Sequence, residues 1–214
     1  MNGNTITLGY TGKQLTSLTH SSGQYIQIDY SGAGLIQTVT DSLGHQTTLT
    51  YDAGNQHLTG AHYFDGRTST YTYNTTGNAA QMHELTAASM SCCNWRYFTY
   101  DSVGRLTGTY LGGNYEAVTF SYPSSGEVVA TDALNNSSKF YYEHRGLLAK
   151  TEDALVNAMH RTFDNGYNLV AVTDPTGRSY NYSYDSQGNL TSSQDPQGGR
   201  IQFAYTTHST GLRH

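Results

Sequence analysis

Apolar and polar residues alternate along most of the chain, and each alternating run ends on an aromatic residue. The run Ile201–Tyr205 places Ile201, Phe203 and Tyr205 on alternate positions, and the run Tyr180–Tyr184 does the same with three tyrosines. A period of two is typical of a β-strand with one apolar face, whereas an amphipathic helix repeats about every 3.6 residues. The hydrophobic pattern therefore predicts strands along the whole chain.

The aromatic residue that closes each run recurs about every 21 residues, so the chain is built from a repeat. A second apolar residue follows most closing aromatics by about six positions, as Leu106 follows Tyr100. We predict that the closing aromatics stack across neighbouring strands as a structural ladder on one face of a sheet. The members of this predicted ladder are Tyr30, Tyr51, Tyr73, Tyr100, Tyr122, Tyr142, Phe163, Tyr184 and Tyr205.

Each repeat contains two turn signals. One follows the aromatic, as in Asp101–Gly104, and the other lies in the middle of the repeat, as in Asp195–Gly198. Aspartate can close a turn with its own side chain, proline presets φ, and glycine accepts a positive φ. Two turns per repeat predict one β-hairpin per repeat, and therefore an all-β antiparallel meander of about ten hairpins and roughly 15–20 strands.

The repeat from Tyr73 to Tyr100 is longer than the others and predicts an insertion at about residues 79–96. Within it, Ala79–Ala88 is rich in helix formers and predicts one short helical turn, and almost no helix is expected outside residues 79–90. Because one repeat continues through the sequence, we predict a single domain over residues 1–214. Residues 206–214 follow the last run and predict a flexible tail.

This insertion is the candidate binding region, because long insertions on a regular scaffold often carry function. Its candidate residues are His83, Cys92, Cys93 and Trp95. Two interpretations are open, namely a loop that packs its apolar residues over the sheet and a functional pocket. Adjacent cysteines rarely direct both thiolates at one tetrahedral metal ion, so we expect no metal site. We expect two free thiols rather than a strained vicinal disulfide.

The remaining sequence predicts a protein without catalytic residues or a cofactor. The candidate carboxylates, such as Asp101 and Asp174, fall at turns, where they cap the backbone. No glycine-flanked nucleophile elbow is present. The net charge is −5 and the 11 basic residues are scattered singly, which argues against nucleic-acid binding. No apolar run approaches the roughly 18 residues of a transmembrane helix, and Met1–Asn4 does not resemble a signal peptide.

The segment Tyr100–Thr107, YDSVGRLT, resembles the YD repeat of the Rhs family, and Tyr184–Thr191 differs from that pattern only at the arginine position. The resemblance extends from Tyr10 to Tyr205. Similar repeats occur in bacterial Rhs proteins, in the shell subunits of insecticidal toxin complexes and in teneurins. The resemblance implies a twisted, spiralling β-sheet, which in large members closes into a hollow shell around a toxin.

The resemblance implies a non-catalytic scaffold, a wall segment of a larger secreted or cell-surface protein that encloses a toxin in some relatives. Thr5–Leu8 and Ile201–Tyr205 look like ordinary strands with uncapped edges, so the expected partners are further YD repeats of a parent protein or other copies of this chain. The alternative is an extracellular module that binds carbohydrates or a cell surface, with aromatic faces stacking on sugars.

Overall fold

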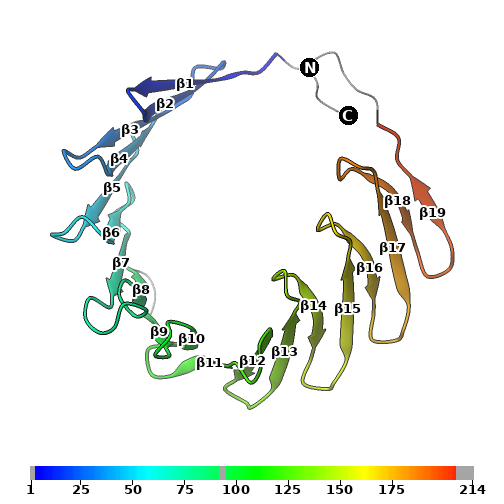
Figure 1. The fold of residues 1–214 in the computed structure, drawn as a ribbon. Coiled ribbons are helices and arrows are strands. Elements are labelled where there is room, and N and C mark those ends of the chain that lie inside the picture. The colour runs from blue at the N-terminus through cyan, green and yellow to red at the C-terminus, as the bar shows by residue number, and fades with distance from the viewer. Residues whose placement is uncertain (1–2, 92–94, 206–214) are drawn as a thin grey trace. The chain divides into compact units, whose positions relative to one another are not determined.

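The computed structural model describes residues 3–91 and 95–205, and these residues form 19 β-strands and no helix (Figure 1). The paired strands are antiparallel and belong to one open sheet, which confirms the predicted all-β fold. In the described part of the chain there is accordingly no helix long and apolar enough to cross a membrane.

The chain divides into two compact units, residues 1–117 and residues 118–214. The first unit contains β1 (Ile6–Thr11), β2 (Gln14–His20), β3 (Tyr25–Tyr30), β4 (Ile36–Asp41), β5 (Gln46–Tyr51), β6 (Leu58–His62), β7 (Thr68–Tyr73), β8 (Leu85–Met90), β9 (Arg96–Tyr100) and β10 (Leu106–Leu111). The strand β11 (Tyr115–Ser121) crosses the division. The second unit contains β12 (Glu127–Asp132), β13 (Ser137–Tyr142), β14 (Leu148–Glu152), β15 (Ala158–Phe163), β16 (Leu169–Thr173), β17 (Ser179–Tyr184), β18 (Leu190–Gln194) and β19 (Arg200–Gln202).

Within each unit, strands that follow one another in sequence pair with one another. The closing aromatic of a repeat lies opposite the second apolar residue, as Tyr51 lies opposite Leu58 and Tyr184 opposite Leu190. The two apolar columns of the sequence are therefore cross-strand pairs, the contacts that stabilise a sheet side chain by side chain. The prediction of one antiparallel hairpin per repeat is confirmed by these registers.

A β-bulge accompanies the closing aromatics. In the hairpin of β5 and β6, Thr50 pairs with Gly60 and Tyr51 pairs with Leu58, which leaves Thr59 as an extra residue. The same register shift occurs immediately before Tyr30, Phe163 and Tyr184. A bulge bends its strand and increases the right-handed twist. These bulges recur at the same position of the repeat and increase the twist of the sheet. The hydrophobic pattern does not reveal them.

The sheet has one layer and, in the described residues, no large side chain that is fully buried. Within residues 3–91 and 95–205, the buried apolar side chains are those of Ala61 and Ala87, and the buried polar residues are His57, Ser69 and Ser192. Most residues of both apolar columns are half-buried instead, because neighbouring side chains on the same face cover them only partly. Stability in this fold comes mainly from backbone pairing and partial burial of many aromatic rings.

The helical turn predicted for Ala79–Ala88 is largely wrong. Residues 79–83 form a hydrogen-bonded turn, in which the amide of Met82 donates to the carbonyl of Asn78, and Leu85–Met90 is the strand β8. Local helix propensity is weak compared with backbone pairing along a whole strand, and β8 pairs with both β7 and β9. The long connection of this repeat consists of residues 74–84, between β7 and β8, and β8 and β9 are ordinary strands of the sheet.

Candidate functional site

The turn aspartates lie where the sequence places them, and each one holds its turn closed. In the turn after β4, one carboxylate oxygen of Asp41 accepts the backbone amides of Leu43 and His45 at 2.8 and 2.9 Å, and the other oxygen contacts His45 Nδ1 at 2.9 Å. Because these turns are tied internally, their carboxylates are structural groups.

The side chain four residues after the aspartate makes a further contact with the same carboxylate. In the turn after β9, Arg105 Nε lies 2.8 Å from Asp101 Oδ2. The backbone amide of Arg105 and its guanidinium lower the pKa of the Asp101 carboxyl. Sequence reasoning missed this pairing, although its signal is visible, because this position is repeatedly a side chain that can donate a hydrogen bond. The partners at this position are His45, Arg105, Asn136, Asn157, Asn168, Arg178 and Asn189.

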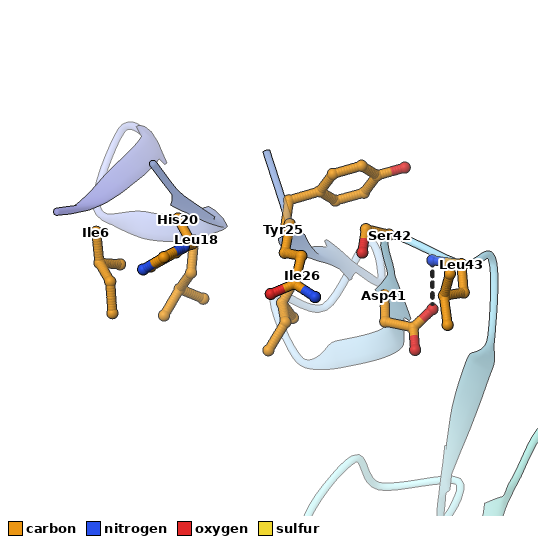
Figure 2. A pocket seen from close by; sticks show the side chains of 9 residues that line it. Ile6, Leu18, His20, Tyr25, Ile26, Asp41, Ser42 and Leu43 are labelled. Atoms are coloured by element: carbon orange, nitrogen blue, oxygen red, sulfur yellow. Dashed lines mark hydrogen bonds between the residues drawn. The ribbon is translucent and has the colours of Figure 1, made fainter. Parts of the chain in front are cut away.

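An open groove lies beside the mid-repeat turn after β4. It has a volume of about 420 Å³, and Figure 2 shows that Ile6, Leu18 and Ile26, from β1, β2 and β3, point to the same side of it. The turn after β4 forms its far wall. The residues that line it are Ile6, Leu18, His20, Gln24, Tyr25, Ile26, Asp41, Ser42 and Leu43.

The same groove recurs at equivalent strands of the repeat. It reappears over β7–β10 with about 420 Å³, beside β13–β16 with about 260 Å³ and beside β17–β19 with about 330 Å³. The last of these is lined by Tyr180, Tyr182 and Ile201, together with the polar residues Gln194 and Arg200. Because the groove recurs at equivalent positions, it is a general feature of the repeat. It does not mark one particular site along the chain.

The connection of residues 74–84 is the one long departure from the repeat in the described part of the first unit, and it contacts two neighbouring turns. Asn78 Nδ2 donates to the carbonyl of Ser102 at 3.0 Å, and Gln81 Nε2 donates to the carbonyl of Asp101 at 3.3 Å. On its other side, His83 Nδ1 lies 2.7 Å from Nε2 of His57, in the turn after β5. The connection therefore joins the turn after β5 to the turn after β9.

His57 is the most buried titratable residue of this contact, with an exposed fraction of 6%. Its Nδ1 lies 2.6 Å from Asp52 Oδ2, and its ring stacks on Tyr73 with 4.5 Å between the ring centroids. The hydrogen bond to His57 lowers the pKa of the Asp52 carboxyl, and burial raises the pKa of the Tyr73 phenol. His57 stands six residues after Tyr51, the usual spacing of the second apolar residue, but Leu58 fills that column because the turn after β5 is one residue longer.

Of the four candidate residues of the insertion, the structure brings His83 into this cluster. Trp95 lies beside Tyr97, with 6.5 Å between their ring centroids. Cys92 and Cys93 lie outside the described residues. Within residues 3–91 and 95–205 there is no group of three or more potential metal ligands.

The family comparison identifies the repeat. The RHS repeat family model matches residues 30–68 and 164–200, one region in each unit. These two regions of the chain match the RHS repeat. No curated protein matches its sequence.

Solved structures show the same fold. A crystal structure of TcdB2-TccC3-TEV superposes with a TM-score of 0.61 at 15% identity, over 98% of this chain and 13% of that one. A crystal structure of TcdB2-TccC3 without its hypervariable C-terminal region gives 0.60 at 11% identity, over 99% and 15%. The Tc holotoxin pore of Photorhabdus luminescens gives 0.52 at 13% identity, over 97% and 13%. The chain thus spans less than a sixth of the length of each.

The hydroxyl groups of some closing tyrosines form hydrogen bonds to a neighbouring strand. Tyr30 Oη donates to the carbonyl of Leu15 at 2.9 Å, and Tyr100 Oη donates to the carbonyl of Leu85 at 2.8 Å. Each phenol therefore reaches back to the strand that precedes its own hairpin. The stacked ladder of aromatic rings, from Tyr30 to Tyr205, stays a prediction.

Proposed function

We propose that the chain is a non-catalytic wall segment of a larger RHS-repeat protein that is secreted or displayed at a cell surface. The proposal rests on the pairing and the exposure of the terminal strands β1 and β19. In the described part of the first unit, β1 pairs with β2 on one side, and its Ile6 and Leu8 are 64% and 47% exposed. In the second unit, β19 pairs with β18 and exposes Ile201 by 61%.

Open edges with apolar side chains are typical of strands that another strand covers, because unpaired amides and carbonyls recruit backbone partners. Further RHS hairpins fit both edges, since they continue the same register and the same apolar columns. The small share of each structural neighbour that this chain spans supports the same conclusion. In such an assembly the chain contributes length and curvature to a wall, and the wall encloses a cargo such as a toxin.

The test is the association state of the isolated chain, measured by size-exclusion chromatography with light scattering from about 1 to about 100 μM. We expect association that grows with concentration. Replacing Ile6 and Leu8 together by lysine places charges on the β1 edge and is expected to weaken it. Leu134→Lys, at a turn residue that is 81% exposed, is the matched control and should leave association unchanged.

A monomer of 23.4 kDa at every concentration, with β1 and β19 both protected from hydrogen exchange, would show that the edges are covered within the chain and would refute the proposal.

A second candidate function rests on the recurring groove. Tyr180 and Tyr182 line one groove together with polar groups of Gln194 and Arg200, a combination that suits the faces and hydroxyls of a sugar. A carbohydrate-binding module would give signals on a glycan array that Tyr182→Ala abolishes. A wall segment gives none, so the array separates the two candidates.

A further inference from the structure

The contact between His57 and His83 joins two segments that are distant in sequence. His57 lies in the turn between β5 and β6, and His83 lies in the connection between β7 and β8. Nε2 of His57 and Nδ1 of His83 are 2.7 Å apart, a hydrogen-bond distance. The two rings are tilted, with 4.8 Å between their centroids. His45, in the turn after β4, contacts the aspartate of its own turn in the same way, whereas His57 also contacts a histidine of a different segment.

Asp52 fixes which nitrogen carries each proton. Its carboxyl is ionised at neutral pH and can only accept hydrogen bonds, so His57 Nδ1 donates to it. His57 Nε2 then has a lone pair, and it accepts the proton on Nδ1 of His83. The remaining lone pair of the cluster is on Nε2 of His83, whose side chain is exposed. The order of donors is therefore His83 to His57 to Asp52.

The pair keeps its hydrogen bond when it takes up one proton. If the proton binds His83 Nε2, the Nδ1–H of His83 still donates to His57. If it binds His57 instead, His57 Nε2–H donates to His83, and the cationic ring is favoured by Asp52 and by the face of Tyr73. Either way a single hydrogen occupies the 2.7 Å gap.

A second proton changes this arrangement. Both facing nitrogens then carry hydrogen, so two donors point at each other, and two cationic rings lie side by side. Rotation of either ring cannot restore the bond, because a protonated imidazole carries hydrogen on both nitrogens and has no acceptor. Protonation of both rings therefore removes the hydrogen bond that joins the two segments.

We propose that Asp52, His57 and His83 form a pH-operated clasp, which holds the connection of residues 74–84 against the turn after β5 at neutral and mildly acidic pH and releases it when both histidines are protonated. The clasp acts on the connection alone. Its contacts to the turn after β9 are made by the neutral amides of Asn78 and Gln81, which do not titrate.

The other charged groups near the connection lie on the side that faces the turn after β9. Asp101 is paired with Arg105 in the turn after β9. Glu84 has a buried carboxylate oxygen and lies near Tyr100, whose phenol pKa is raised by burial and, to a smaller extent, by that carboxylate. Protonation of Glu84 is the competing source of an acid effect at the connection, and the variant Glu84→Gln removes it.

The experiment is hydrogen exchange of the backbone amides of residues 80–84 in the full chain between pH 8 and about pH 4.5, corrected for the intrinsic pH dependence, since unperturbed histidines titrate near pH 6.5. We expect protection of these amides to fall at least about tenfold across that range, while amides in β4 and β5 keep theirs. Glu84→Gln should show the same fall.

The variant His83→Gln provides the decisive comparison. A glutamine amide can donate to His57 or, after flipping, accept from it, and it does not titrate. In this variant, the protection of residues 80–84 should therefore not fall between pH 8 and about pH 4.5 as it does in the unmodified chain. His160→Gln, at an exposed histidine of the second unit, is the matched control and should behave as the unmodified chain.

An unchanged acid step in His83→Gln would overturn the proposal, as would full protection of residues 80–84 at pH 4.5 in the unmodified chain. Nitrogen-15 spectra of the imidazole rings give an independent check at pH 8. They should show hydrogen on Nδ1 of both His57 and His83, and hydrogen on Nε2 of His57 would contradict the donor order from which the clasp is derived.

Discussion

The hydroxyl group of Tyr51 donates a hydrogen bond to the carbonyl oxygen of Ile36 at 2.8 Å. This bond closes a gap in the backbone ladder. The strands β4 and β5 pair from Gln46 to Thr48, opposite Thr40 to Thr38, and the pairing stops there. The carbonyl of Ile36 lies just beyond its end, where the bulge at Tyr51 turns the strand away. The closing tyrosine therefore supports the junction between one RHS hairpin and the next.

Tyr51→Phe removes this hydrogen bond and leaves the ring in place. We expect the free energy of unfolding, measured with urea, to fall by about 0.5–1.5 kcal/mol, the usual net contribution of one hydrogen bond. Tyr115→Phe, at a tyrosine that is 69% exposed, is the control and should have no effect. Phe163 closes its own repeat without a hydroxyl, so Phe163→Tyr should raise stability if its new hydroxyl reaches the carbonyl of Leu148. An unchanged stability in Tyr51→Phe would show that water replaces the bond without cost.

Gly104 tests the packing of the connection of residues 74–84 on the turn after β9. Its φ is +84°, and a Cβ added there would lie 2.5 Å from the carbonyl oxygen of Ala80. Gly146 has a φ of +80° and open space around the same position. Both Gly104→Ala and Gly146→Ala should lose roughly 1 kcal/mol because alanine is strained at positive φ. The first should lose measurably more in thermal or urea unfolding, and equal losses would show that the connection moves aside freely.

Replacing an aromatic residue by alanine should lower stability more where the ring is more buried. Phe203 is 40% exposed, so the loss of about 3–5 kcal/mol typical of a buried ring is not expected for Phe203→Ala. Tyr182, in the middle of β17, is half-buried between two paired strands, and Tyr182→Ala should cost more. Urea unfolding of the two variants measures the difference. A larger loss in Phe203→Ala would mean that something covers β19.

The turn carboxylates predict a loss of stability in acid. The hydroxyl of Thr176, then the backbone and guanidinium of Arg178, place the pKa of Asp174 well below its usual range. A carboxyl whose pKa is depressed in the folded state stabilises that state above its unfolded pKa, about 3.9, and the contribution disappears as pH falls toward the folded value. The urea midpoint should therefore decline below about pH 4.

Asp174→Asn keeps an oxygen that can accept hydrogen bonds but has no charge to titrate. The acid decline should be shallower in this variant than in the unmodified chain, with a lower stability at pH 7. An equally steep decline would mean that Asp174 titrates as it does in the unfolded chain.

Local patterns in the sequence are enough to predict the repeat, the strands and the turns. Period-two alternation, aspartate and glycine at fixed offsets, and a closing aromatic are local signals that act within one hairpin, and each agrees with the others. The pairing of Tyr184 with Leu190 follows from them, because a short turn leaves few other registers. The prediction that turn aspartates are structural has the same origin.

The contacts between hairpins, by contrast, depend on tertiary packing. His57 and His83 are 26 residues apart in sequence, and no local pattern places one imidazole against the other. The bulge before Tyr51 and its bond to Ile36 depend on where a backbone ladder stops, which is set by twist along several strands. Leu85–Met90 became a strand although the preceding residues favour helix, because β7 and β9 offer backbone partners on both sides. Contacts between elements depend on the packing of the whole sheet, and they cannot be read directly from the local sequence pattern.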